Sequence, residues 1–269
     1  MKTNHKMKRK LFVILAFVVL FATDKAMAWS GLTHNAIGHI ADQHLTPEAK
    51  AKRNHYLHHT LAYYASWQDE VAWATQYAET RFWHSVRFDA KNRFEYRDGR
   101  NAITHISRIW KEMRNGGYKR LDDSTIIVNL KLLTHMVGDM HCPSHNMYDS
   151  DPRIKRFSIF HKGKKVHWHK FWDSSASTYF HKGWTCQDYQ KNLDVLTPKQ
   201  IAKICKGTPE QWAKQNGKEM REPYSLLIRH TELSEMPQEN IERMTEIVDL
   251  QILRGGYRLA HIINDIFKE

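Results

Sequence analysis

Two His-x-x-x-Asp pairs in apolar surroundings constrain the fold of this chain more than any other feature of its sequence. In His135–Asp139 and in His169–Asp173, an imidazole and a carboxylate stand about one helical turn apart, on one face of a helix. Aliphatic and aromatic residues flank both pairs, and burying ionisable groups among them costs free energy unless their charges are neutralised. The pattern therefore predicts helices that pack around a polar centre.

A helical His/Asp pair on its own is more typical of a surface ion pair. Two pairs, with His145 between them just beyond Pro143, favour a metal centre, because helices can aim nitrogen and oxygen donors at a shared ion. Asp69 and His84 are further candidate donors. The chain has eighteen histidines, and histidine is the commonest metal-binding side chain.

Helical patterns dominate the rest of the chain. Apolar residues recur at helical spacing in four stretches, 36–40, 103–113, 126–137 and 244–266. Three threonines, each followed by proline, have the pattern of helix N-caps: Thr46, Thr197 and Thr208. No repeat, low-complexity tract or Gly/Ser linker is present, so the sequence predicts a single all-α domain with long loops at one end.

Two segments depart from the helical pattern. Residues 81–100 are typical of an irregular excursion, with no helical periodicity. Residues 154–168 alternate around Lys162-Gly163-Lys164, which predicts a small β-hairpin.

Residues 1–28 have the pattern of a secretory signal peptide. Residues 2–10 are basic, residues 11–22 are apolar, and Ala26-Met27-Ala28 is a small-x-small cleavage site. The apolar run has twelve residues, too few to span a bilayer. Cleavage would make Trp29 the first residue, and its free amine and carbonyl could chelate one metal ion. His34 follows about one helical turn later.

Without residues 1–28, the chain has 241 residues, 35 of them Lys or Arg and 28 Asp or Glu, which gives a formal charge of +7. A moderately basic exported protein fits a polyanionic or phosphorylated substrate, although the charge equally fits a role in solubility alone. Of three cysteines, at least one must remain unpaired. Cys186 and Cys205 are candidates for a disulfide worth about 3 kcal/mol, and we expect Cys142 to be a buried free thiol near the site rather than a ligand.

In chain order, these residues resemble the zinc-dependent single-strand nucleases of the S1/P1 type. The resemblance covers nearly the whole mature chain and rests on six motifs: an N-terminal Trp29, Gly-x-x-His34, Ser-Trp-x-Asp69, Trp-His84, His135-x-x-Gly-Asp139-x-x-x-Pro-x-His145 and His169-x-x-Trp-Asp173.

The resemblance implies an all-α domain over residues 29–269 around a trinuclear zinc site. It places the first zinc on Asp69, His84 and His135, the second on Trp29 and His34, the third on His145, His169 and Asp173, and Asp139 as a bridge between the first two. Such a cluster would activate water at neutral pH and clamp the attacked phosphate, while Asp69 would orient the nucleophile as the catalytic residue.

The resemblance also implies an activity and a location. We expect an exported, periplasmic or secreted hydrolase that cleaves single-stranded DNA and RNA to 5′-phosphorylated products and acts on 3′-nucleotides. Its partners would be single-stranded nucleic acid or nucleotides. We expect a monomer with no stable membrane association after cleavage of the signal peptide.

The chain departs from the family at two positions that contact substrate. Ser85 stands where an aromatic usually stacks on a base, a contact worth about 1–3 kcal/mol. Val71-Ala72 replaces the usual basic residue after Asp69. Four aromatic residues are candidates for the stacking role: Phe82, Trp83, Phe88 and Tyr96.

Two other functions fit the same motifs. A zinc-dependent phospholipase C shares the three-zinc plan but typically ends on His-x-x-x-Glu, whereas this chain has Asp173. A non-catalytic exported protein that binds zinc or nucleic acid could use Lys162, Lys164 and Lys165 to contact phosphates. The open coordination that nine ligands would leave on three ions favours the nuclease.

Overall fold

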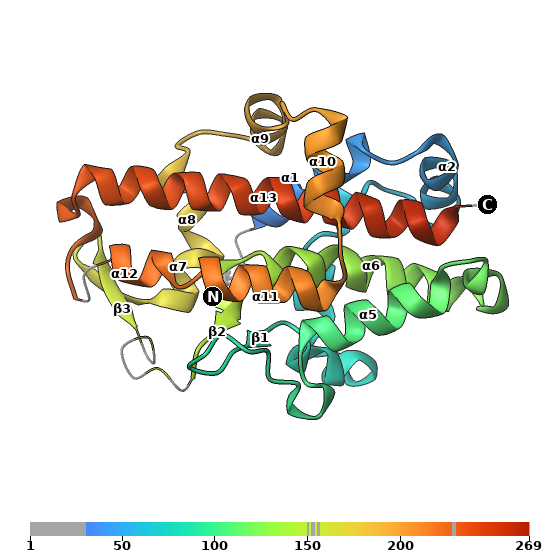
Figure 1. Cartoon of the computed structure of the whole chain (residues 1–269), viewed down its shortest axis with the longest axis horizontal. Coiled ribbons are helices and arrows are strands. Elements are labelled where there is room, and N and C mark those ends of the chain that lie inside the picture. Colours follow the sequence, from blue (N-terminus) through green and yellow to red (C-terminus); the bar gives the residue numbers. More distant parts are fainter. Residues whose placement is uncertain (1–30, 150, 152–153, 155–156, 228–229, 269) are drawn as a thin grey trace, which may run out of the picture.

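Helices that pack along one another form almost all of the structure (Figure 1). The computed structural model describes residues 31–149, 151, 154, 157–227 and 230–268. The longest helix is α13 (Gln238–Phe267), and α6 (Asp123–Met140) lies beside it. The prediction of an all-α fold is therefore confirmed.

Shorter helices surround this pair. The remaining α-helices are α1 (Gly31–Gln43), α2 (Pro47–Tyr56), α3 (Leu61–Tyr64), α4 (Trp67–Val71), α5 (Ala102–Met113), α7 (Trp168–Ser174), α8 (Ala176–Phe180), α9 (Cys186–Leu193), α10 (Pro198–Cys205), α11 (Pro209–Glu219) and α12 (Glu222–Leu226). The 3-10 turns are η1 (Thr75–Phe82), η2 (Arg97–Gly99), η3 (Gly117–Arg120), η4 (Pro143–His145) and η5 (Leu233–Glu235).

Local sequence signals explain where these helices begin. Thr46, Thr197 and Thr208 each accept a hydrogen bond from a backbone N–H of the first turn, with proline inside that turn. These are the three predicted N-caps, and all three are confirmed. The four predicted apolar stretches lie in α1, α5, α6 and α13.

Helix α6 runs from the surface into the core. Asp122 caps it by accepting a hydrogen bond from the Thr125 N–H. Every residue from Leu132 to Met140 is buried, so the C-terminal half of α6 is enclosed on all sides. The end of this helix therefore delivers its side chains to the interior of the protein.

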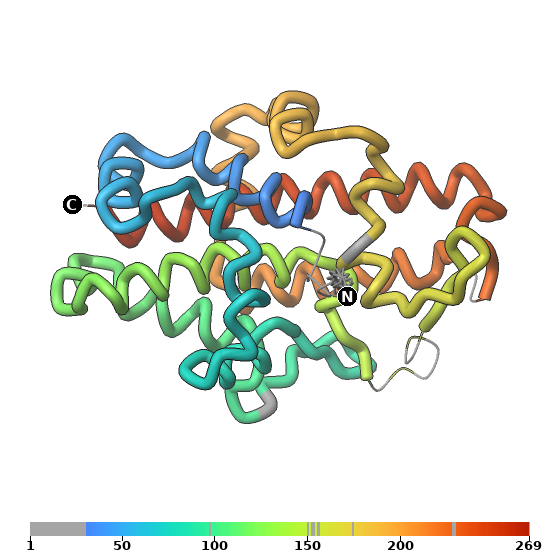
Figure 2. Tube along the Cα trace, turned by 180° about the vertical axis from the view of Figure 1, so that it is seen from behind, coloured from blue at the N-terminus to red at the C-terminus, as the bar shows by residue number. Residues whose placement is uncertain are grey.

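Helix α1 packs unusually close to its neighbours, and Figure 2 shows it (blue) beside α13 (red). A Cβ added to Gly38 would lie 2.7 Å from Cα of Ala62 in α3, and one added to Gly256 would lie 2.5 Å from Cγ2 of Ile40. These glycines let the backbones approach. The approach fixes the position of α1 relative to α3 and α13.

Strands occur only as two small pairs among the described residues. β1 (Val86–Arg87) pairs in parallel with β2 (Asn146–Met147), and β3 (Ser158–His161) pairs antiparallel with β4 (Lys164–His167). Lys162 and Gly163 form the turn of the second pair with φ of 53° and 70°, as a two-residue hairpin loop requires. The predicted hairpin is confirmed. Within the predicted excursion at 81–100, the regular elements are the end of η1, the short strand β1 and the 3-10 turn η2. This segment is therefore largely irregular, as predicted.

The candidate disulfide between Cys186 and Cys205 is wrong for this structure, in which all three cysteines are free. Cys186 begins α9 and donates to Oε1 of Gln187 at 3.0 Å, whereas Cys205 ends α10, where it is buried and hydrogen-bonds the carbonyl of Tyr257 at 3.4 Å. Helix α9 packs on α1 and α10 packs on α13. The two thiols therefore have different partners on different helices.

The predicted signal peptide (1–28) and Trp29 lie outside the described residues. Within the described part of the chain, every helix is too short or too polar to cross a bilayer.

We predict that Gly38→Ala destabilises the protein by about 1–3 kcal/mol, because the new methyl group would overlap the backbone of α3. Gly255→Ala is the matched control, since its Cβ would meet only side-chain atoms of Ile37, at 3.1 to 3.3 Å, and no backbone atom among its nearest neighbours. In that variant the gain in helix propensity, about 0.5–1 kcal/mol, offsets the contact. Denaturant unfolding of both variants measures the difference, and equal stabilities would contradict the packing described for α1.

Candidate metal centre

His135 and Asp139 lie in the buried C-terminal half of α6, where both side chains are fully buried. The ring Nδ1 of His135 donates to the carbonyl oxygen of Ala65 at 2.7 Å. Because Nδ1 is used in this hydrogen bond, Nε2 is the ring nitrogen that can bind a metal ion. It points toward Asp139, 3.1 Å away.

The carboxylate of Asp139 is the meeting point of four histidines. Its Oδ1 lies 3.3 Å from Nε2 of His34 and 3.4 Å from Nε2 of His145. Its Oδ2 lies 2.8 Å from Nδ1 of His84 and 3.1 Å from Nε2 of His135. Residues from α1, the segment after η1, α6 and η4 therefore converge on one carboxylate.

Asp69 closes one side of this cluster from the short helix α4. Its Oδ1 lies 3.5 Å from Nδ1 of His84 and 3.5 Å from Nε2 of His135. One donor atom from each of these three residues lies within 4.8 Å of the other two. The side chain of Asp69 is 15% exposed, so Asp69 lies at the solvent-facing edge of the cluster.

His34 reaches Asp139 because α6 has no side chain at position 138. The rings of His34 and His135 stack at 4.4 Å between centroids, and a Cβ on Gly138 would lie only 2.4 Å from Nδ1 of His34. His34, His135 and Asp139 form a second group of donor atoms within 4.8 Å of one another.

A third group lies where η4 meets α7. His145 Nε2 is 3.7 Å from Oδ1 of Asp173, and His169 Nδ1 is 3.0 Å from Oδ2 of Asp173. The side chain of His169 is 58% exposed and opens this group to solvent. Cys142, His145 and Asp173 also have donor atoms within 4.8 Å of one another. Cys142 is a buried free thiol beside the site, as predicted.

The cluster shifts the pKa of its members in opposite directions. Burial lowers the pKa of His135, but Asp139 and Asp69 outweigh it and hold that pKa well above its ordinary value. Burial also lowers the pKa of His145, but the nearby carboxylates, Asp139 first among them, outweigh burial and raise that pKa to about 9. For Asp69, the effect of His135 outweighs burial and lowers the pKa to about 2. Alternating charges therefore stabilise one another in a buried position.

The donor set fits a metal ion. Oδ1 of Asp139 and both ring nitrogens of His145 are buried and form no hydrogen bond among the described residues, although Oδ1 of Asp139 and Nε2 of His145 lie within ion-pair distance of each other. Buried polar atoms normally form a hydrogen bond, and a bound metal ion would satisfy these atoms instead. Imidazole nitrogen and carboxylate oxygen are the donors that zinc prefers in catalytic sites. The three groups of donors are compatible with more than one ion.

Eight of the nine predicted ligands are described, and the structure brings all eight into this one cluster: His34, Asp69, His84, His135, Asp139, His145, His169 and Asp173. Sequence reasoning overlooked Gln68, whose Nε2 donates to the carbonyl of Thr80 at 3.0 Å and lies 3.2 Å from Nε2 of His84. Gln68 is fully buried, and only its place in the Ser-Trp-x-Asp motif could have indicated this role.

A cavity of about 570 Å³ opens beside the third group, with His169, Trp168, Tyr224, Ser85 and Arg87 in its wall. The wall combines aromatic and polar side chains, as ligand sites commonly do. Because His169 belongs both to this wall and to the cluster, a molecule in the cavity would lie next to the cluster.

The four candidate stacking aromatics differ in exposure. Phe88 is buried, and Trp83 stacks on His105 at 3.6 Å between ring centroids. Tyr96 is exposed and donates a hydrogen bond to Glu210. Phe82 is half-buried and lines a separate cavity next to Ser85. Phe82 therefore lines a cavity that shares Ser85 with the cavity beside the cluster.

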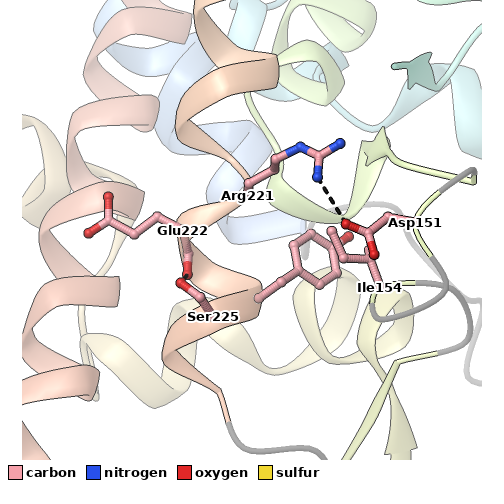
Figure 3. Close-up of a pocket in the computed structure, with 6 residues that line it drawn as sticks. Asp151, Ile154, Arg221, Glu222 and Ser225 are labelled. Carbon is pink, nitrogen blue, oxygen red and sulfur yellow. Dashed lines mark hydrogen bonds and ion pairs between the residues drawn. The ribbon is translucent and has the colours of Figure 1, made fainter. Parts of the chain in front are cut away.

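Another cavity, of about 330 Å³, shares Ile154 and Tyr224 with the first. Figure 3 shows Arg221 in its wall, directed at Asp151. Arg221 donates to Oδ2 of Asp151 at 3.0 Å and to the carbonyl of Asp89 at 3.2 Å, and it covers the ring of Tyr148 at 4.5 Å. This guanidinium is already used in holding loops together.

Comparison with known families agrees with this geometry. Residues 29–268 match the profile of the S1/P1 nuclease family. No match to a curated protein was found. Because the match covers nearly the whole chain, the chain belongs to the S1/P1 nuclease family and is a hydrolase that acts on phosphodiester bonds of nucleic acid.

Proposed function

We propose that this protein is an exported, zinc-dependent nuclease that hydrolyses single-stranded DNA and RNA to 5′-phosphorylated products and acts on 3′-nucleotides. The observation that carries the proposal is the convergence of His34, His84, His135 and His145 on the buried carboxylate of Asp139, in a chain of this nuclease family.

The three groups of donors would hold three zinc ions. Asp69, His84 and His135 would hold one, His34 a second together with Trp29, and His145, His169 and Asp173 the third, with Asp139 shared by the first two. Bound zinc would lower the pKa of water and polarise a phosphoryl oxygen. The thiol of Cys142 would pack beside the third site.

The side chains of the cluster would divide the remaining work by their exposure. Asp69, at the solvent-facing edge, would orient the attacking water. Its pKa of about 2 keeps it ionised at neutral pH, so its carboxylate can accept a hydrogen bond from that water. His169, the most exposed donor of the cluster, would lie nearest the incoming phosphate in the cavity it helps to line.

The depth of the cluster favours unpaired strands. His34, His135 and Asp139 are fully buried, and His84 and Asp69 are 12% and 15% exposed. A duplex is too wide and stiff to bring a phosphate to such a recessed position, whereas a single strand can bend. Because the donors would grip phosphate rather than base, we expect cleavage of both DNA and RNA.

The proposal of export rests on residues 1–28, which have the pattern of a signal peptide; the family match covers the residues after them, 29–268. Helix α1 begins at Gly31 and places His34 against Asp139 within its first turn. The free amine of Trp29 would then complete the second metal position.

We predict that Trp29 is the N-terminal residue of the active protein, because a blocked or displaced amine cannot chelate. N-terminal sequencing of protein isolated in active form tests this. A variant with one Met before Trp29 should bind one zinc fewer and lose most of its activity. A different first residue in the active protein would contradict the proposal.

We predict that metal-free protein takes up about three zinc ions and releases protons as it does so. His135 and His145 have a raised pKa, about 9 for His145, so both rings hold a proton at pH 7 and must lose it to bind metal. The α-amine of Trp29, whose ordinary pKa is about 7.7–8.0, must also lose its proton. At least two protons should therefore be released, and affinity should fall as the pH drops. Titration calorimetry in buffers of different ionisation enthalpy measures the number.

Single substitutions test the same prediction position by position. His135→Ala and His169→Ala should each lower the zinc content, from different groups. His181→Ala is the matched control, because His181 pairs with Asp249 at 2.7 Å outside the three groups of donors. One zinc ion or none in wild-type protein, or heats that do not depend on the buffer, would refute the cluster.

We predict that Asp69→Asn folds normally but reduces kcat by about 10²–10³-fold, the usual loss when one oriented electrostatic group is removed. Asp249→Asn, which alters a His/Asp pair outside the cluster, should keep full activity. Hydrolysis of single-stranded DNA, RNA and a 3′-nucleotide by zinc-loaded protein provides the measurement. Ser85→Phe should lower KM for oligonucleotides by adding a stacking surface.

The substrate panel should include phosphatidylcholine. Cleavage of this lipid without any action on oligonucleotides or 3′-nucleotides would replace the nuclease with a phospholipase C. Binding of zinc and oligonucleotide without hydrolysis of any substrate would leave a non-catalytic protein.

A further inference from the structure

The cavity that Phe82 lines has a volume of about 450 Å³ and is strongly basic. It shares Ser85 with the cavity beside the cluster. Its wall contains Arg81, Phe82, Ser85, Arg87, Asp98 and Arg100. Three arginines face a single carboxylate, so the cavity has an excess of positive charge. Both views of the molecule place the chain segment that forms it on the side of α6 away from α13 (Figure 1, Figure 2).

Two of these arginines have uncommitted guanidinium groups. Arg81 and Arg100 are exposed and lie over the ring of Phe82, at 4.8 and 4.7 Å from its centroid. Among the described residues, neither guanidinium has a carboxylate within ion-pair distance or a hydrogen bond to an acceptor. Arg221 of the neighbouring cavity is different, since its guanidinium is held by contacts within the protein.

The fold brings these two arginines together from distant places in the excursion. Arg81 lies in the last turn of η1, and Arg100 precedes Asn101, the residue that caps α5 by accepting from the Thr104 N–H. The backbone N–H of Ala102 donates to the carbonyl of Ser85 at 3.1 Å, which ties the start of α5 to the segment beside the cluster. The cavity is therefore held by the same elements that position His84.

The basic cavity adjoins the cavity beside the cluster. Ser85 and Arg87 line both, and the cavity beside the cluster contains His169. Arg87 forms an ion pair with Asp149, so Arg81 and Arg100 are the cavity's charges without such a partner among the described residues. A single strand with one phosphate at the cluster could cross Ser85 and place a neighbouring phosphate between these arginines.

We propose that Arg81, Arg100 and Phe82 form a second phosphate subsite, which binds a phosphate of the single strand next to the one that is cleaved. The proposal rests on the proposed nuclease function and adds a contact that an oligonucleotide makes and a 3′-nucleotide does not. A guanidinium is planar and offers paired N–H donors that match phosphate oxygens. Packing on Phe82 holds both guanidinium planes in place before the strand arrives.

This subsite would offset the affinity for substrate that is lost because the chain lacks two contacts usual in the family. Ser85 offers no ring to stack on, and Val71-Ala72 offers no cation. Contacts with phosphate carry no sequence information, so the subsite would strengthen binding of every sequence equally. It would leave a 3′-nucleotide, which has a single phosphate, without any gain.

The first test measures binding without catalysis. Metal-free wild-type protein, Arg81→Gln and Arg100→Gln are titrated with a fluorescent single-stranded oligonucleotide at several salt concentrations. Removing one arginine–phosphate ion pair should make the negative slope of log K against log salt, where K is the association constant, less steep by about 0.7. It should also weaken binding of different sequences to the same degree. Arg108→Gln is the matched control, because Arg108 on nearby α5 is exposed and lies outside the cavity.

The second test uses zinc-loaded protein and separates KM from kcat. Arg81→Gln and Arg100→Gln should raise KM for an oligonucleotide several-fold with kcat nearly unchanged, and should leave both constants for a 3′-nucleotide unchanged. Salt slopes and KM values equal to those of Arg108→Gln would overturn the subsite while leaving the nuclease intact. Weaker oligonucleotide binding by both variants, in a protein that cleaves nothing, would support the subsite and overturn the nuclease. Wild-type protein that binds no oligonucleotide would overturn both.

Discussion

The buried carboxylate of Asp139 is the interaction on which the rest of the structure depends. A lone carboxylate in this position would be costly, because burial strongly disfavours the charged form. Four imidazoles within 3.4 Å offset that cost. They hold the pKa of Asp139 well below its ordinary value against the effect of burial, with His135 and His145 the largest contributors. Because these charges offset one another, imidazole nitrogens and carboxylate oxygens can lie close together in a space from which water is largely excluded.

Satisfying this carboxylate determines how the helices pack. Each imidazole comes from a different part of the chain, so α1, α6 and η4 must meet at one point. Gly138 makes room for the ring of His34, and Gly38 lets α1, the helix that carries His34, approach the backbone of α3 closely. Backbone contacts therefore help to position the side chains of the cluster, as a metal centre would require.

The residues that line the cavities beside the cluster, and that would contact substrate, lie in the least regular part of the fold. The cluster is built on helices, whereas the two cavities beside it are lined largely by the excursion at 81–100 and by the segments around β2 and β4. Loops can change without disturbing the packing of helices. The walls of these cavities could therefore change while the packing that holds the cluster stays the same.

The sequence by itself determined the helices and the members of the cluster. Periodicity and threonine caps act within one or two turns, and a His/Asp pair such as His135–Asp139 shares a helix face whatever surrounds it. Only the tertiary structure decided which donors meet, that Cys186 and Cys205 take different partners, and that Arg81 and Arg100 flank one ring. These outcomes depend on the path of irregular segments. Neighbouring residues do not fix that path, because it is set by long-range contacts such as the hydrogen bond between Ala102 and Ser85.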